Sequence, residues 1–145
     1  MTSLTTLADY EAFVYSLADR YPAVLRATLV VISRGRGAAE VSGELEFEEG
    51  VRLGVREYLR FDLRPPRLLQ YSYEICRGSE KLFWYDSQPH PGDPVLATTH
   101  PHHKHVPPDI KHNRLPAPSL SFTEPNLPVL VAEIEREVLT TPASA

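Results

Sequence analysis

Apolar residues recur at three- and four-residue spacing near both ends of the chain. Residues 7–21 carry one such stripe, which predicts a helix. Thr6, followed three residues later by an acid, has the pattern of a capping box that begins this helix, and Pro22 is expected to end it. A second stripe covers residues 127–138 and is preceded by Asn126 and nearby prolines. The sequence therefore predicts one amphipathic helix near each end.

Between these helices the apolar and polar positions alternate, as is typical of β-strands with one buried face. The most regular alternation spans residues 38–49, and residues 51–62, 69–75 and 82–85 repeat it. Residues 26–33 are apolar on both sides and predict a buried strand. The connections are too short for crossover helices, so the strands are expected to pair antiparallel. The predicted fold class is α+β, with a five-stranded antiparallel meander sheet, an N-terminal helix and a C-terminal helix.

Residues 86–125 show no sustained period. They hold nine of the 14 prolines and all six histidines. A long irregular stretch of this kind inside a compact domain is usually either functional or disordered. We predict a single domain over residues 1–145, with an ordered core of about residues 5–139 and a long His/Pro-rich loop over residues 86–125.

The composition favours a cytoplasmic protein. The chain has no apolar run long enough to cross a bilayer, and its first ten residues lack the basic and apolar segments of a signal peptide. Its single cysteine, Cys76, cannot form an internal disulfide, which suits a reducing compartment. The net charge of -4 argues against nucleic-acid binding over the whole surface, but it is compatible with a local basic site.

Glu57 is the first candidate for acid–base chemistry. By strand parity it points the same way as Val55 and Leu59, into the apolar face of its strand. Burial raises the pKa of a carboxyl unless a cation pairs with it, and a raised pKa suits a general acid or base near neutral pH. Two other outcomes stay open. A bulge near Arg56 would turn Glu57 outward, or neighbouring Arg and Tyr side chains would simply pair with it.

Tyr71 and Tyr73 form the second candidate site, together with Tyr85 and Asp86. The first two tyrosines are two residues apart and therefore line one face of a strand. Phenol rings over a cleft stack on nucleobases or donate hydrogen bonds to phosphate. The alternative is ordinary core packing, with the hydroxyl groups at the rim.

The third candidate is the histidine-rich segment, which reads Pro-His-His-Lys-His over residues 101–105. Residues 100–114 contain three permanently charged cations and one acid, Asp109. Their five histidines add positive charge when protonated. This local potential suits phosphate. A divalent metal held by histidines and Asp86 is the competing interpretation, although Lys104 inside the cluster disfavours it. A solvated polar loop is the third interpretation. We expect no cofactor, with a metal at the histidines as the alternative.

Several motifs together resemble one known family. They are Tyr71-Ser72-Tyr73, Leu82-Phe83-Trp84-Tyr85-Asp86, Pro89-His90-Pro91 and Pro101-His102-His103-Lys104-His105-Val106, with Arg56-Glu57-Tyr58 upstream. The pattern is similar to that of the TumE-type toxins of prokaryotic type II toxin–antitoxin systems. The resemblance covers roughly residues 7–139, nearly the whole chain, and implies a small cytoplasmic toxin whose partner is a cognate antitoxin protein.

Our hypothesis for the activity is metal-independent cleavage of RNA. A base takes the proton of the 2′-hydroxyl, an acid protonates the leaving oxygen, and a cation stabilises the charge on the phosphate. The candidate bases are Glu57, His102, His103 and His105. His90 is the candidate acid and Lys104 the candidate cation. The candidate substrate-binding residues are Arg56, Tyr71, Tyr73, Tyr85 and Asp86.

Two alternatives remain open from the sequence. One is a non-catalytic toxin or adaptor that binds RNA or protein through the same residues. The other is a metal-dependent nuclease or nucleotidyl-transfer enzyme that uses the histidines as ligands. A homo-oligomer is compatible with the sequence.

Overall fold

Residues 4–87, 102–106, 114–117 and 119–140 are described by the structure, a computed structural model. The helices are α1 (Leu7–Tyr15), α2 (Leu17–Arg20) and α4 (Leu127–Glu133), which continues into the π-helical turn η2 (Ile134–Val138). The strands are β1 (Arg26–Ala27), β2 (Val30–Ser33), β3 (Ala38–Glu46), β4 (Val51–Arg60), β5 (Arg67–Arg77), β6 (Glu80–Asp86), β7 (His103–His105) and β8 (Arg114–Pro116), with a short 3-10 helix η1 (Glu48–Gly50) between β3 and β4.

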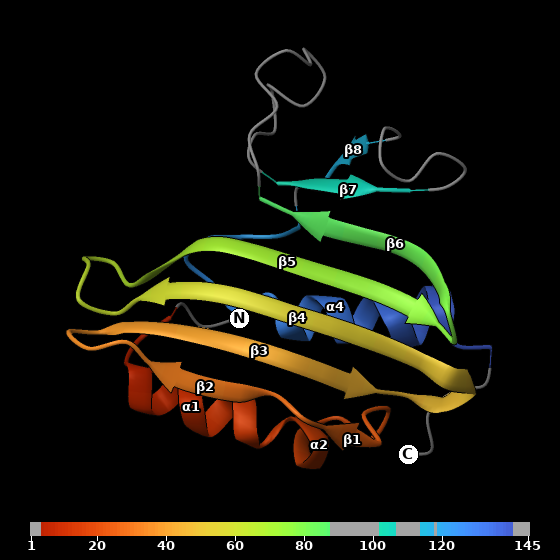
Figure 1. The fold of residues 1–145 in the computed structure, drawn as a ribbon, viewed down its shortest axis with the longest axis horizontal. Coiled ribbons are helices and arrows are strands. Elements are labelled where there is room, and N and C mark those ends of the chain that lie inside the picture. Colours follow the sequence, from red (N-terminus) through yellow and green to blue (C-terminus); the bar gives the residue numbers. More distant parts are fainter. Residues whose placement is uncertain (1–3, 88–101, 107–113, 118, 141–145) are drawn as a thin grey trace.

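These strands form one antiparallel sheet in the order β1-β3-β4-β5-β6-β7-β8 (Figure 1). β1 and β2 lie end to end along the same side of β3, so the described sheet is seven strands wide. Tyr10 of α1 and Asn126 at the start of α4 both reach side chains of one face. We call this side, which holds Glu57 and Tyr73, the covered face, and the side of Arg56 the open face. The predicted α+β class is confirmed.

The predicted alternation of apolar and polar residues along β4 is confirmed, and it determines which side of the sheet forms the core. Val51, Leu53, Val55 and Leu59 are buried on the covered face, and Glu57 is buried with them. Successive side chains of a strand point to opposite faces, so the arginines between these residues project from the open face. The chain thereby buries its apolar side chains beneath the helices and presents its charged side chains on the other side.

The first helix begins as predicted and is then divided. The backbone N–H of Asp9 donates to Thr6 Oγ1 over 3.1 Å, which caps α1. The prediction of one continuous helix over residues 7–21 is wrong, because α1 and α2 are separated at Ser16. The Ser16 hydroxyl donates to the carbonyl oxygen of Phe13. A hydroxyl bonded to the preceding turn competes with regular helical bonding and favours a bend.

The prediction of a single buried strand over residues 26–33 is also wrong. The segment forms two short strands at the edge of the sheet, and Val30 and Ile32 are 49% and 38% exposed. Gly43 of β3 explains the break, since a Cβ there would lie only 2.5 Å from the carbonyl oxygen of Thr28. Thr28 lies close to β3 but is not paired in the regular way, because its Oγ1, rather than a backbone carbonyl, accepts the Glu44 N–H over 3.1 Å.

The histidine-rich segment is not only a loop, which corrects the prediction of five strands. β7 pairs with β6, and β8 pairs with β7. These three-residue strands are too short to show a hydrophobic period in the sequence. The backbone of β7 pairs with the edge of β6, which carries unsatisfied N–H and C=O groups when nothing lies beside it. In the part of the chain that the structure describes, no helix is long and apolar enough to cross a membrane.

Candidate active site

Four residues lie opposite one another on neighbouring strands. In the register of the sheet, Arg56 of β4 pairs with Ser72 of β5, which pairs with Asp86 of β6. Asp86 in turn pairs with His103 of β7. Neighbouring strands are about 4.8 Å apart, so a cation, a hydroxyl and a carboxylate come close together across the open face. We call Arg56, Ser72, Asp86 and His103 the polar row.

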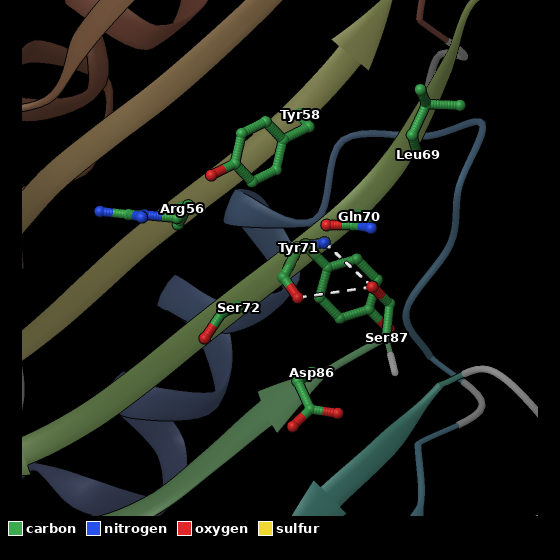
Figure 2. A pocket seen from close by; sticks show the side chains of 8 residues that line it. All are labelled: Arg56, Tyr58, Leu69, Gln70, Tyr71, Ser72, Asp86 and Ser87. Carbon is green, nitrogen blue, oxygen red and sulfur yellow. Dashed lines mark hydrogen bonds between the residues drawn. The ribbon is translucent and has the colours of Figure 1, made fainter. Parts of the chain in front are cut away.

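A cavity of about 440 Å³ opens beside the polar row (Figure 2). Its lining residues are Arg56, Tyr58, Leu69, Gln70, Tyr71, Ser72, Asp86 and Ser87. Ser87 ties the end of β6 to β5, because its Oγ accepts the backbone N–H of Tyr71 over 3.0 Å. The cavity therefore has walls from three adjacent strands, which the backbone pairing holds in place.

Arg56 differs from the other arginines of its strand. Arg52 donates to Glu44 over 3.0 Å and Arg60 donates to Asp62 over 2.6 Å, so each has a carboxylate partner. The Arg56 side chain is exposed, and it makes no hydrogen bond or ion pair to any residue that the structure describes. An uncompensated guanidinium at the wall of a cavity is suited to hold an anion such as phosphate.

The Asp86 carboxylate is held from the neighbouring strand. His105 Nε2 lies 3.1 Å from Asp86 Oδ2, and the His105 ring stacks on Trp84 with the ring centroids 4.5 Å apart. Trp84 Nε1 also donates to Asp86 Oδ2, over 3.4 Å. His105 is only 3% exposed, whereas Asp86 reaches the cavity. Asp86, rather than His105, is therefore the member of this pair that lines the cavity.

Glu57 lies on the covered face, as strand parity predicted, and is 0% exposed. Tyr10 donates its hydroxyl hydrogen to Oε1, and Tyr73 donates to Oε2, each over 2.5 Å. Burial raises the pKa of the Glu57 carboxyl, and the two tyrosine hydrogen bonds offset part of that rise. Burial and the charge of Glu57 likewise raise the pKa of both tyrosines. They therefore remain protonated donors.

This buried cluster joins the helices to the sheet. Asn126, which precedes α4, donates through Nδ2 to the Tyr73 hydroxyl over 3.2 Å and to the carbonyl oxygen of Ser121 over 3.0 Å. Its side chain makes no capping bond to α4. Glu57 is thus linked to α1 through Tyr10 and to the start of α4 through Tyr73. The catalytic role of Glu57 stays a prediction, and its burial among tyrosines favours a role in holding the fold.

Tyr71 and Tyr73 are stacked within the core. Their ring centroids are 5.0 Å apart, and Tyr71 and Tyr73 are 3% and 0% exposed. The His102 ring is stacked with the Tyr71 ring, with the ring centroids 5.7 Å apart, and its Nδ1 lies 2.5 Å from the Tyr71 hydroxyl oxygen. This burial favours the packing interpretation of the two tyrosines, whereas their proposed contact with RNA stays a prediction.

Lys104 and Tyr85 both donate a hydrogen bond to Glu133 of α4. Lys104 Nζ donates to Glu133 Oε2 over 3.0 Å and lies 4.1 Å from the centroid of the Phe83 ring. The Tyr85 hydroxyl donates to the same carboxylate over 2.7 Å. Burial, together with Glu133, raises the pKa of Tyr85, so the phenol stays protonated. Glu133 compensates the charge of Lys104, which favours a structural role for the cation that was expected to stabilise phosphate.

We expect Lys104→Met to lower the free energy of unfolding by about 1.5–3 kcal/mol, because the variant loses a partly buried, charge-assisted hydrogen bond while it keeps the apolar stem. Urea titration followed by circular dichroism measures the change. Unchanged stability together with a hundredfold loss of toxin activity would instead assign Lys104 to the reaction.

The comparison with known families agrees with the motifs. The family model described as Toxin TumE matches residues 14–138, which is most of the chain. The chain belongs to the TumE toxin family. No curated protein and no solved structure gave a significant match to this TumE-family chain.

The fold divides the expected catalytic residues of the TumE-family chain between the two faces. A single acid–base site made of Glu57 and the histidines requires the imidazole rings to gather around Glu57. Of the two histidine side chains that the structure describes, His102 contacts Tyr71 on the covered face, and His105 contacts Asp86 on the open face. That expectation is therefore wrong for His105, whose strand neighbour Trp84 belongs to the opposite face from Glu57. His90, His100 and His112 lie outside the described residues.

Sequence reasoning missed several walls of the cavity. Tyr58 is two residues further along β4 than Arg56 and therefore shares the open face. Strand parity alone could have indicated this position. Gln70 follows two adjacent leucines, Leu68 and Leu69, and such a break in alternation is a bulge signal. Ser72 was part of a family motif, but only the register across three strands brings it between Arg56 and Asp86. In the described segments, no group of three or more His, Cys, Asp and Glu side chains is arranged to hold a metal ion.

Proposed function

We propose that this TumE-family toxin is a metal-independent endoribonuclease whose active site is the polar row on the open face. The observation that carries the proposal is the exposed Arg56 guanidinium, which has no partner among the described residues and lies two strands from the Asp86 carboxylate at one cavity. A cation beside groups that transfer protons is the minimum needed to cleave a phosphodiester without a metal.

The proposed reaction is a transesterification within the RNA chain. A base removes the proton of a ribose 2′-hydroxyl, and the 2′-oxygen forms a bond to the adjacent phosphorus. The bond from phosphorus to the 5′-oxygen of the next nucleotide breaks, and an acid gives that oxygen a proton. The products are a 2′,3′-cyclic phosphate and a 5′-hydroxyl end, so no water, metal or oxidant is consumed in this step.

The roles of His103, Arg56 and Asp86 are argued from their positions in the sheet. His103 is assigned as the base, because the register places it opposite Asp86, and a carboxylate stabilises an imidazole that gains a proton. Arg56 binds the phosphate and stabilises the charge that develops on it. Trp84 and His105 hold the Asp86 carboxylate in place. His90 keeps its role as the acid, as a prediction from the sequence.

In the cell, the toxin is expected to act on RNA in the cytoplasm and to be neutralised by a cognate antitoxin protein. Its acidic net charge is compatible with this target, since the phosphate contacts are confined to one local site. A toxin that only binds RNA or protein would use the same surface without transferring protons.

The test compares two arginines of one strand and one face. Purified protein is incubated with RNA in the presence of EDTA, and the product ends are identified by mass spectrometry. We expect 2′,3′-cyclic phosphate and 5′-hydroxyl ends, with a rate that falls about a hundredfold or more in Arg56→Ala. Arg52→Ala is the matched control, because Arg52 is already paired with Glu44, and it should cleave at nearly the original rate.

Three results would overturn parts of the proposal. Growth arrest by a protein that cleaves no RNA would favour the binding alternative. Activity that requires a metal and disappears with EDTA would favour the metal-dependent alternative. Equal losses in Arg56→Ala and Arg52→Ala would show that only the general charge of the face matters.

A further inference from the structure

The cavity extends beyond the residues that the proposed reaction uses. Arg56, Ser72 and Asp86 of the polar row line one part of it, and Tyr58, Leu69 and Gln70 line another part (Figure 2). Its volume of about 440 Å³ is within the range of pockets that hold small organic ligands. Cleavage of a phosphodiester requires no such additional space, so the second part of the cavity needs its own explanation.

A β-bulge builds that second part. Tyr58 pairs with Gln70 while the next residue of β4, Leu59, pairs with Leu68, so Leu69 has no partner on β4. The extra residue is turned away from the regular alternation, and Leu69 is 48% exposed although its neighbour Leu68 is 1% exposed. Bulges are over-represented next to active sites, where they re-aim a side chain. Here the bulge presents a large apolar side chain at the cavity.

Tyr58 and Gln70 supply the polar and aromatic groups beside it. They are directly opposite in the register, one on β4 and one on β5. In the structure as described, neither the Tyr58 hydroxyl nor the Gln70 side-chain amide makes a hydrogen bond, and Gln70 is exposed. An amide offers one acceptor oxygen and one donor NH₂ group side by side, a pair that complements the edge of a nucleobase.

The spacing joins this part of the cavity to the phosphate site. Arg56 and Tyr58 are two residues apart on one face of β4, which corresponds to about 7 Å, the scale of one nucleotide. Single-stranded RNA is recognised mainly through unstacked bases that pack on aromatic rings and are hydrogen-bonded along their edges. A phosphate at Arg56 would therefore place its own base beside Tyr58, Leu69 and Gln70.

We propose that the cavity binds one unstacked nucleobase of single-stranded RNA, with Tyr58 and Leu69 against its faces and Gln70 hydrogen-bonded to its edge. This inference deepens the proposed ribonuclease function and rests on it for the identity of the ligand as RNA. Gln70 is thereby a specificity-determining residue, which selects the base next to the bond that is cleaved.

The test measures binding separately from cleavage. The four nucleoside 3′-monophosphates are titrated into the His103→Ala variant, and chemical shifts of the protein follow binding. We expect one base to bind more tightly than the others by about five- to a hundredfold, the range for one bidentate contact. Gln70→Leu should remove this preference, and Tyr58→Ala should weaken all four ligands by about tenfold or more.

A change of charge at Gln70 provides the sharpest test of the base pocket. Gln70→Glu replaces the donor of the amide with a second acceptor, so it should favour guanine, whose N1–H and N2–H₂ are adjacent donors. Sequencing of the RNA cleavage sites should show the same shift in the active protein. Glu74→Gln is the matched control, because it exchanges carboxylate and amide on the same strand outside this cavity, and it should leave the base preference unchanged.

The outcomes separate the two proposals. If the protein cleaves no RNA but binds nucleotides with a preference that depends on Gln70, the ribonuclease proposal fails and the base pocket stands. If it cleaves RNA and Gln70→Glu leaves the cleavage sites unchanged, the base pocket is wrong while the ribonuclease proposal stands. Absence of nucleotide binding to correctly folded His103→Ala also overturns the base pocket.

Discussion

His103→Ala is expected to lower the rate of RNA cleavage by two to four orders of magnitude and to abolish growth arrest. Loss of a group that transfers a proton in the transition state typically has an effect of about a hundred- to ten-thousandfold. The register pairs His103 with Asp86 in the row that also holds Arg56. Asp86→Asn should show a loss of similar size, because the amide cannot stabilise an imidazolium. Initial rates on a defined RNA, with the antitoxin absent, measure both effects.

The charge-preserving variant His103→Arg distinguishes catalysis from binding. It keeps a positive charge at the site but cannot act as a base near neutral pH. If the toxin only binds its target, His103→Arg should still arrest growth, whereas a ribonuclease should be inactive. Thermal unfolding of each variant is the control for folding, and a folded His103→Ala protein that cleaves RNA at the original rate would rule out this assignment.

Glu57→Ala is expected to lower the free energy of unfolding by about 3–5 kcal/mol. Two buried tyrosine hydroxyls, those of Tyr10 and Tyr73, would lose their acceptor, and each unsatisfied buried donor costs about 1–3 kcal/mol. The truncated side chain also leaves space in a core where Glu57 is 0% exposed. Because most domains are stable by only about 5–15 kcal/mol, this loss should be evident in urea titrations. A loss below 1 kcal/mol would contradict the structural role.

Glu57→Gln should behave differently, and its effect should depend on pH. Burial raises the folded-state pKa of Glu57 above its unfolded value. The contribution of the carboxyl to stability is then fully present below the unfolded pKa, and it is lost as the pH rises toward and through the folded pKa. Glutamine does not ionise, so the variant should gain stability relative to the original protein as the pH rises, by about 1.4 kcal/mol for each unit of pKa difference.

Matched measurements complete this test. Glu44→Gln alters a carboxylate on β3 that is only partly buried, and its stability difference should change much less with pH. Activity of Glu57→Gln then decides the role of the residue. A folded variant that cleaves RNA at the original rate assigns Glu57 to the core, whereas a hundredfold loss would restore it as a catalytic candidate.

The sequence alone determined the features that depend on local periods and caps. Alternation with a period of two placed Glu57 among the apolar side chains of its strand and, by the same parity, Arg56 on the opposite face. The pattern around Thr6 marked the start of α1, and the motifs from Arg56 to Val106 indicated the family. These features follow from the geometry of a single strand or helix, so residues near in sequence are enough to specify them.

Only the tertiary structure decided which residues meet. The pairing of β6 with β7 placed His105 beside Asp86, and the packing of Tyr71 placed His102 on the other face. The lack of an ion pair at Arg56, within the described residues, also depends on strands that are distant in sequence. Register across a sheet is set by contacts between separate segments, each satisfying backbone groups of its neighbour. For this reason the sequence indicated which residues have acid–base side chains, and only the pairing of the strands decided which of them line the same cavity.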